Sequence, residues 1–541
     1  MYYRDIFRVL SKYMTLLGST LLLPIFVCIY YELLLPPSQH LQPHSLNAFL
    51  VTLLACLACA LLFKILGKGS KGKLFRKECL ALVLMFWIFT SIISSLPFLF
   101  SGTLSRPTDC LFEAVSGLTT TGATVMEAKS YDSDNKEQDK QIVFTINNQQ
   151  NTYNYQGTIE PIVDKKNGTL ILEGLEAVSK GVLFWRGFTQ WLGGMGIVLL
   201  FVSNLPAFGV GGKVLFQAES TGPVVGEITA RVSQTANYLW KIYVGLTFLE
   251  VLLLCIFCKK IPVIDTVLIS FSSISTGGFC ALTDSIAGYQ DSVAEWIIML
   301  FMIIGGVNFS LYFFFFRGKF FKILDRELAY YLLFLLVLGG LVAYYNFRDI
   351  DYNSSFSNGL RNSFFQLIST QTSTGYVTQD YTRWSTINQF ILYISMFIGS
   401  MASSTGGGIK IIRHLLLFKI LKTKIEAIFH PETVRKVSIG NKSIDQKVEA
   451  NILSFYALIL LLSLLGAFIF VFDGLDVITS FAVNACMINN VGVAFGAASP
   501  TSSFAFLPVL SKYTSMLWML MGRLEFFGLL IILFPSFWKR M

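Results

Sequence analysis

The chain has 541 residues, of which 54% are hydrophobic and only 14% are charged. Soluble domains rarely tolerate this balance, so the composition excludes a soluble globular protein and predicts a polytopic membrane protein. The net charge of +9 is explained by basic residues at the cytoplasmic ends of spans and by contact with membrane lipids, so it does not require a nucleic-acid partner.

Ten apolar runs are long enough to cross a bilayer, which takes roughly 20 residues. They cover residues 14–34, 46–66, 79–101, 183–208, 236–258, 292–316, 329–347, 387–418, 450–473 and 510–535. Most of the 42 Lys and Arg residues fall on the cytoplasmic side if the N-terminus lies inside, which predicts that orientation. No cleavable signal peptide is expected, because the first apolar run has full spanning length.

The runs divide the chain into an accessory N-terminal helix pair and four pore repeats. We expect the pair at 1–70, repeat one at 71–210, repeat two at 211–318, repeat three at 319–430 and repeat four at 431–541. Each repeat reads as a span, a re-entrant segment and a second span. The predicted fold is therefore an all-α polytopic membrane protein with four pseudo-symmetric helix–pore loop–helix repeats around one pore.

An insertion at residues 127–180 lengthens the first repeat. Apolar and polar residues alternate at 141–146 and at 152–155, and Asn167-Gly168 is a turn signal. This pattern predicts a small β-hairpin on the outer face. The hairpin either touches the pore mouth or is a surface insertion, and the second interpretation is favoured.

Four short stretches, at 119–122, 275–278, 372–375 and 489–492, read alike, and each follows an amphipathic segment. These segments predict short half-helices at 110–118, 263–273, 360–369 and 477–488, whose C-terminal dipole ends favour a cation. Glycine turns backbone carbonyls inward at little steric cost, and a ring of carbonyls replaces the hydration shell of K⁺. The expected filter residues are Thr120, Thr121, Gly122, Thr276, Gly277, Gly278, Ser373, Thr374, Gly375, Asn490, Val491 and Gly492. The alternative, that such clusters only allow close helix packing, does not explain why they recur four times at the same place in a repeated unit.

The run at 387–418 contains three successive glycines and is expected to break, because glycine destabilises a helix by about 1 kcal/mol relative to alanine. A polar loop below the filter suits a gate, although it also fits a passive kink. The expected gate residues are Ser403, Ser404, Thr405, Gly406, Gly407, Gly408, Lys410 and Arg523.

Arg523 lies in the last apolar run, where an unpaired charge costs at least about 2.5 kcal/mol. We expect it to face the pore and to limit leak of cations, with a structural ion pair to Glu525 or another acid as the alternative. Arg186 is expected at the outer boundary of the fourth span.

Three strings carry a family resemblance: LFEAVSGLTTTGAT at 111–124, QWLGGMG at 190–196 and SSTGGGIK at 403–410. On these residues the chain resembles the TrkH/KtrB family of potassium uptake proteins, and its TrkH branch most closely. The resemblance implies that Gly122, Gly278, Gly375 and Gly492 mark backbone that coordinates K⁺, and that 403–410 belongs to the gate. Sodium-preferring relatives often have serine at the first glycine, so Gly122 favours potassium. The fourth loop lacks the proline that often follows the family's glycine, which leaves its geometry open.

The resemblance also implies a bacterial inner-membrane protein, a homodimer and a cytosolic TrkA-like nucleotide-binding ring. Segments 205–235 and 419–447 are candidate docking surfaces, or else plain solvated loops. K⁺ is the expected transported ion, with no organic cofactor. Sodium- or proton-coupled symport is the alternative mechanism. A membrane-embedded enzyme is not expected, because no catalytic motif is found, and the nine cysteines lie in or near apolar segments without nearby metal-binding partners.

Overall fold

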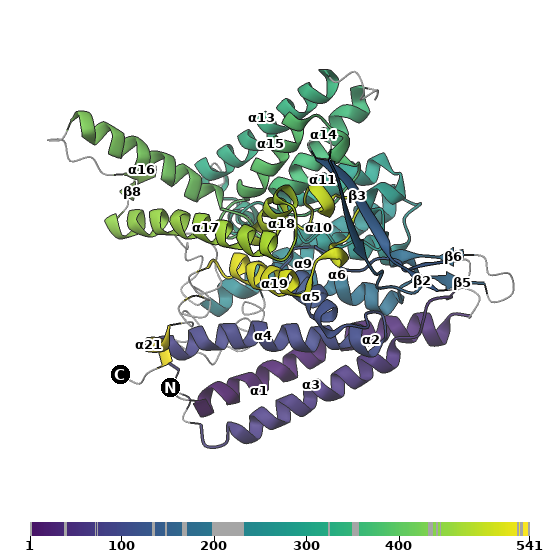
Figure 1. Ribbon diagram of the computed structural model, residues 1–541. Helices are drawn as coiled ribbons and strands as arrows, with labels where there is room; N and C mark the ends of the chain where they lie inside the picture. Colours follow the sequence, from purple (N-terminus) through teal and green to yellow (C-terminus); the bar gives the residue numbers. More distant parts are fainter. Residues whose placement is uncertain are drawn as a thin grey trace.

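A computed structural model of the chain describes residues 3–36, 40–70, 72, 74–132, 136–146, 149–164, 170–196, 232–322, 325–348, 356–430, 437–439, 442–443, 445–526, 530 and 534–538. These residues are mainly helical, as predicted (Figure 1). The helices are α1 (Tyr3–Thr20), α2 (Leu22–Cys28), α3 (Leu46–Leu66), α4 (Arg76–Phe100), α5 (Pro107–Leu118), α6 (Lys180–Gly194), α9 (Val232–Phe257), α10 (Val263–Ile274), α11 (Ser292–Gly305), α12 (Phe309–Phe316), α13 (Arg326–Arg348), α14 (Phe356–Gln371), α15 (Thr386–Phe397), α16 (Ile411–Phe429), α17 (Gln446–Phe472), α18 (Val477–Asn489), α19 (Val509–Arg523) and α21 (Pro535–Trp538).

Among the described residues, six helical stretches are long and apolar enough to cross a membrane, or seven if the bent pair α11 and α12 forms one span. The six are Tyr3–Leu34, Leu46–Leu66, Lys77–Phe100, Thr235–Phe257, Arg326–Arg348 and Gln446–Phe472. They coincide with six of the ten predicted spans. The chain is thus an integral membrane protein with many apolar helices.

The other predicted spans are not single straight helices. The run at 292–316 bends by 95° between α11 and α12. The chain passes Gly305 and Gly306 at this bend. The Asn308 side chain then caps α12 by accepting a hydrogen bond from the Ser310 N–H at 2.9 Å. The run at 387–418 breaks between α15 and α16, as its glycines predict. In the run at 510–535, α19 ends at Arg523, and residues 527–529 and 531–533 lie outside the described part of the chain. The run at 183–208 begins with α6, and its last residues lie outside the described part of the chain.

The first helices form one side of the molecule, where α1, α3 and α4 pack against one another (Figure 1). Their contact buries large side chains such as Phe49, Phe86 and Trp87. This group joins the rest of the molecule through α2 and α4, which contact α6. The N-terminal helices are therefore packed on the outside of the central helices.

Four short helices, α5, α10, α14 and α18, lie at the centre of the molecule, and they closely match the predicted half-helices. Local sequence explains where two of them begin. Pro107 stands at the first turn of α5, where its missing N–H costs nothing. The Asp476 side chain caps α18 by accepting from the Thr479 N–H at 3.0 Å.

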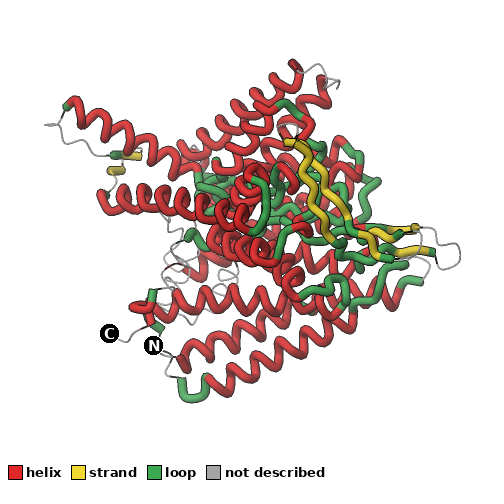
Figure 2. The backbone as a smooth tube through the Cα atoms, viewed as in Figure 1, coloured by secondary structure: helices red, strands yellow, loops and turns green. Residues whose placement is uncertain are grey.

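The insertion forms strands on the opposite side of the molecule from the tips of α16 and α17 (Figure 2). The strands are β1 (Ser130–Tyr131), β2 (Glu137–Gln138), β3 (Lys140–Ile146), β4 (Gln149–Tyr155), β5 (Ile162–Val163) and β6 (Leu170–Leu172); a further pair, β7 (Ser438–Ile439) and β8 (Lys442–Ser443), lies between α16 and α17. The predicted hairpin is β3–β4, with Lys140 opposite Tyr155. The insertion contains two more antiparallel pairs, β1–β2 and β5–β6, and the predicted turn signal Asn167-Gly168 lies between β5 and β6. The Asn167-Gly168 turn lies outside the described residues.

Candidate functional site

Each short central helix ends in a loop with the same unusual backbone. In every loop a polar residue has positive φ, and a glycine two positions later has positive φ again. The pairs are Thr120 (55°) and Gly122 (80°), Thr276 (52°) and Gly278 (80°), Ser373 (59°) and Gly375 (82°), and Asn490 (56°) and Gly492 (89°). Alternation of positive and negative φ turns successive carbonyl groups toward one side of the chain.

The four loops, residues 119–122, 275–278, 372–375 and 489–492, meet in a closed ring, which we call the four-loop ring. A Cβ built on Gly122 would collide with the backbone oxygen of Gly277. The same collision occurs from Gly278 to the oxygen of Thr374, from Gly375 to that of Val491, and from Gly492 to that of Thr121. Each glycine therefore lies against a carbonyl of the next loop, and the fourth loop closes onto the first. Any side chain at these glycines would push neighbouring loops apart.

The polar residues with positive φ carry backbone strain. Thr120 and Thr276 are β-branched, and this conformation costs a residue of that kind about 1–3 kcal/mol. Asn490 tolerates it better, and its side-chain amide donates to the Thr121 hydroxyl at 2.9 Å and to the Met519 carbonyl at 3.0 Å. The fourth loop thus reaches the common geometry with asparagine where the other loops have threonine or serine.

A loop between α15 and α16, residues 398–410, lies against one end of the ring, and we call it the inner loop. Its Gly407 N–H donates to the Ser373 hydroxyl, and its Gly408 N–H donates to the Asn489 carbonyl at 2.9 Å. The Thr405 hydroxyl lies 2.9 Å from the carbonyl oxygens of both Ile274 and Gly305. The inner loop is therefore bonded to the ends of α10, α11 and α18 and to the third loop of the ring.

Arg523, the last residue of α19, completes this cover below the first loop of the ring. Its guanidinium donates to the Thr120 hydroxyl at 3.2 Å, to the Thr405 carbonyl at 2.9 Å and to the carbonyls of Gly193 and Gly194. The neighbouring acid Glu525 forms an ion pair with Arg413 of α16. Arg523 thus connects the ring to the inner loop, in the position that suits the pore-facing interpretation.

Little space remains between the inner loop, the fourth loop and Arg523. A cavity of about 20 Å³ is lined there by Gly406, Gly407, Asn490, Arg523 and other residues. That volume holds about one water molecule. Among the described residues, the space next to the inner loop therefore admits about one water molecule.

The remaining predicted gate residues lie in the same loop. Ser404 donates to the Met401 carbonyl at 2.6 Å, and Ser403 accepts at its carbonyl from the Phe309 N–H at 3.2 Å. Lys410 is buried at the end of the loop, and its ammonium donates to the Gly406 carbonyl at 2.6 Å. All eight predicted gate residues and all twelve predicted filter residues thus belong to one connected region.

The opposite, outer end of the ring opens into a cavity of about 90 Å³ that is lined by all four ring glycines. Arg186 of α6 lines this cavity and pairs with Glu113 of α5, with 2.8 Å between Nε and Oε1. Arg186 also donates to the Cys280 carbonyl at 3.1 Å, and Glu113 accepts from the Val125 N–H at 3.0 Å. The buried ion pair therefore braces the chain that leaves the first two loops, at the end of the ring opposite the inner loop. The outer position of Arg186 stays a prediction.

Other polar groups in the site were not anticipated from the sequence as functional. Gln190 of α6 donates to the Gly277 carbonyl and accepts from the Phe279 N–H at 3.0 Å, so it clamps the second loop. Glu250 is fully buried in α9 and accepts from the Ser273 hydroxyl of α10. The only signal available for Gln190 was its place in the QWLGGMG string; Glu250 stood alone in an apolar run.

The insertion touches the outer end of the site through β4. The Tyr153 hydroxyl donates to the Asp476 carboxylate at 3.0 Å and accepts from the Asp476 N–H at 2.7 Å. The Tyr153 ring also lies 5.6 Å from that of Phe506. The hairpin is therefore bonded to the start of a central helix, and its role at the pore mouth stays a prediction.

The chain matches the family model TrkH, described as a cation transport protein, over residues 165–342 and 350–539. It is 32% identical to the Trk system potassium uptake protein TrkH of Salmonella typhimurium over 100% of both chains. It is 30% identical to the protein of the same name from Escherichia coli K12, again over 100% of both chains, and 30% identical to TrkG of that organism over 87% of both.

The fold is similar to the crystal structure of the potassium transporter TrkH from Vibrio parahaemolyticus. The TM-score is 0.79 at 28% sequence identity, and the match covers 100% of both chains. The similarity therefore includes the first loop of the ring, which precedes the residues matched by the family model.

Proposed function

Because this chain belongs to the TrkH family of cation transport proteins, we propose that it takes up potassium across the bacterial cytoplasmic membrane through a gated filter formed by the four-loop ring. Its relatives are named as potassium uptake proteins, and these are transporters rather than enzymes. K⁺ is the transported ion in this proposal, and no organic cofactor takes part.

The observation that carries the proposal is the closure of the ring. Four loops with the same alternating φ pattern approach one another so closely that each glycine lies against the next loop's carbonyl oxygen. Such a ring presents backbone oxygens from four directions, and oxygens of this kind replace the water around a potassium ion. The C-terminal ends of α5, α10, α14 and α18 lead into it and add a negative potential.

The inner loop and Arg523 form the gate in this proposal. Together they bond to all four loops or their supporting helices and leave room for about one water below the ring. A cation that passed the ring would meet the Arg523 guanidinium, which repels it. Conduction therefore requires both the loop and the arginine to move.

Cation competition in liposomes tests this function. Purified protein is reconstituted, and uptake of labelled Rb⁺ is measured against increasing external K⁺ or Na⁺. We expect K⁺ to compete at much lower concentrations than Na⁺. Equal competition by both ions would contradict a potassium-selective filter, and uptake that persists only with an imposed sodium or proton gradient would favour coupled symport.

We also infer that the chain is the membrane subunit of a larger assembly, a homodimer that binds a cytosolic TrkA-like nucleotide-binding ring. The relatives are named as parts of a Trk system. The α16–α17 hairpin extends beyond the other helices on the side opposite the insertion and offers a surface for such a partner (Figure 1). The other predicted docking segment, 205–235, lies almost entirely outside the described residues.

A further inference from the structure

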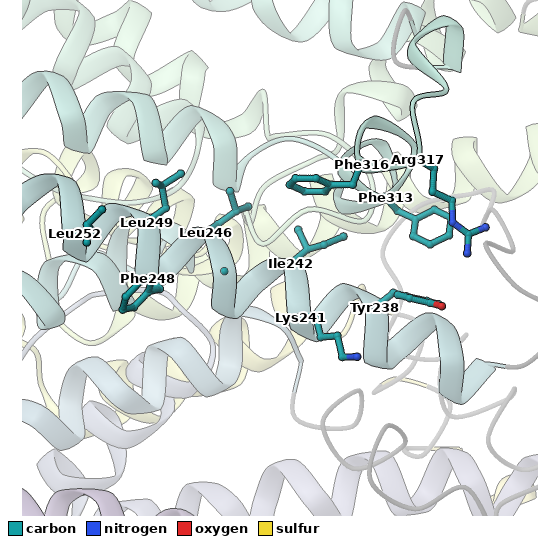
Figure 3. A pocket seen from close by; sticks show the side chains of 11 residues that line it. Tyr238, Lys241, Ile242, Leu246, Phe248, Leu249, Leu252, Phe313, Phe316 and Arg317 are labelled. Carbon is teal, nitrogen blue, oxygen red and sulfur yellow. The ribbon is translucent and has the colours of Figure 1, made fainter.

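A groove runs along the outside of the second repeat between α9 and α12 (Figure 3). Its volume is about 560 Å³. One part is apolar and is lined by Leu249, Leu252 and Phe248, of which Phe248 is 67% exposed. At the other end lie Tyr238, Lys241 and Arg317, so the two cations share one end of the groove (Figure 3).

A glycine of α9, Gly245, forms part of the wall of the groove. A Cβ built on Gly245 would meet nothing within 4 Å. A glycine inside a helix costs about 1 kcal/mol relative to alanine, and close packing does not explain it here. Its effect is to deepen the groove midway between its cationic and apolar ends.

The cationic end has the chemistry of a phosphate site. The Arg317 guanidinium lies over the Phe313 ring at 4.4 Å from its centroid and near the Tyr238 ring at 5.8 Å, which holds its position. Among the described residues, neither Arg317 nor Lys241 has an acidic partner in an ion pair. Lys241 lies within the apolar stretch Thr235–Phe257, where a lysine extends its ammonium toward the headgroup region.

We propose that this groove binds one anionic phospholipid of the inner leaflet, with its phosphate between Lys241 and Arg317 and an acyl chain passing Gly245 toward Leu252. Both cations belong to segments on the cytoplasmic side in the predicted orientation, where anionic headgroups lie. The lipid joins α9 to α12, and the α12 residue Phe309 donates its N–H to the inner-loop carbonyl of Ser403. The bound lipid therefore stabilises a helix on which the inner loop rests.

Native mass spectrometry of the purified full-length protein tests this site, with added phosphatidylglycerol or phosphatidylcholine as probes. We expect preferential binding of phosphatidylglycerol. Each cation near an anionic lipid is worth about fivefold in binding, so Lys241→Gln with Arg317→Gln is expected to weaken phosphatidylglycerol binding by more than about tenfold. Lys319→Gln, exposed two residues further along and outside the groove, is the matched control and should bind as the unmodified protein does.

A second pair of variants tests the acyl channel. Gly245→Leu adds a side chain in the wall of the groove, at a position where a Cβ meets nothing within 4 Å. Gly340→Leu makes the same change in α13, where a Cβ also meets nothing within 4 Å. We expect only Gly245→Leu to lower lipid binding, whereas the two variants, which make the same change inside a helix, should have equal melting temperatures in lipid-free detergent. Equal phosphatidylglycerol binding by the double variant and its control would overturn the proposal. So would loss of a dimer in Gly245→Leu alone, because a second copy of the chain would then cover the groove.

Discussion

At the scale of single residues, the ring glycines combine two demands that only glycine meets. They have φ between 80° and 89°, and each lies against a neighbouring carbonyl. A positive φ by itself also occurs at glycines outside the ring: Gly102 has φ 71°, with nothing within 4 Å of a built Cβ. The second demand is specific to the ring and separates filter geometry from simple turn formation.

This comparison gives the first prediction. Gly122→Ala should lower potassium uptake at least about tenfold, because its methyl group displaces the Gly277 carbonyl. An increase of about 1.4 kcal/mol in the free-energy barrier to ion passage is enough for that factor. Gly102→Ala, with similar backbone strain at an open position, should retain uptake. The measurement is Rb⁺ flux in liposomes that contain equal amounts of folded protein. Similar flux in both variants would remove Gly122 from the filter.

Arg523 and Arg186 are both enclosed arginines with different expected roles. Arg523→Ala should raise the resting flux by about tenfold or more, because a charge a few ångströms from the ion path contributes more than about 1.4 kcal/mol to the barrier. Single-channel recording or efflux from K⁺-loaded liposomes measures this. An unchanged resting flux would exclude Arg523 from the gate.

Arg186→Ala should instead reduce stability. Arg186 and Glu113 are almost fully buried, and removal of one partner from such a pair costs about 3–5 kcal/mol because the other charge stays buried. We expect a lower melting temperature and less folded protein, without a raised resting flux per folded molecule. A normal melting temperature would show that water or another group replaces the guanidinium.

The residues of the ring were predictable because their pattern is local and occurs four times. The side chains that brace these loops, such as Gln190 and Arg186, could not be predicted in this way. Gln190 is 87 residues from Gly277, and Arg186 is 73 residues from Glu113. No local pattern relates such pairs, so they become visible only when the helices are packed. The role of Arg523 was predicted from the cost of its charge, whereas its partner Thr120, 403 residues away, was not.

At the scale of elements, the inner loop is held by a few polar bonds rather than by a packed helix. Such a segment opens at lower free energy than a helix buried on its apolar face. Thr405 is central to it, since its hydroxyl shares one proton between the carbonyls of Ile274 and Gly305. The loop can therefore be loosened by a small change that leaves the ring intact.

Thr405→Val tests this. It keeps the shape of the side chain and removes a hydrogen bond worth about 1 kcal/mol, so the resting flux should rise by about fivefold. Thr514→Val is the control, because within the described part of the chain that hydroxyl bonds only to the Leu510 carbonyl of its own helix, at 3.0 Å. Equal resting flux in both variants would show that the loop is not the barrier.

The elements themselves were predicted with uneven success for physical reasons. The half-helices were found because short amphipathic segments precede each glycine loop. The 95° bend between α11 and α12 was missed, because an apolar run through Gly305 and Gly306 gives the same hydropathy whether it is straight or bent. The insertion's contact with α18 was missed because Tyr153 and Asp476 are 323 residues apart.

At the scale of the whole molecule, the proposed gate is continuous with the projecting α16–α17 hairpin. The inner loop leads directly into α16, whose far end lies beyond the other helices (Figure 1). A partner that moves the tip of α16 would move the loop's attachment at Ile411. The division of the chain into an accessory pair and four repeats stays a prediction, but this connection does not depend on it.

The hairpin gives the last prediction. Lys422 and Lys424 are exposed near the end of α16. The double variant Lys422→Glu with Lys424→Glu should weaken binding of the cytosolic subunit and abolish the effect of that subunit on flux. The flux without the subunit should be unchanged. Lys12→Glu with Lys68→Glu makes the same charge change at exposed positions of the accessory pair and should have no effect. Co-purification and flux with the subunit present measure both. Full stimulation of the α16 variant would place the docking surface elsewhere.

The closure of the ring between its first and last members has a consequence for biosynthesis. Asn490 reaches Thr121 across 369 residues, and Arg523 reaches Thr120 across 403. In the proposed function, the ribosome has therefore synthesised almost the entire polypeptide before the ion pathway is complete. Arg523, the proposed block, follows the last ring residue, Gly492, by only about thirty positions. If the ring is the filter as proposed, products of premature termination before residue 490 lack a complete ion pathway and are not expected to dissipate the ion gradients of the cell.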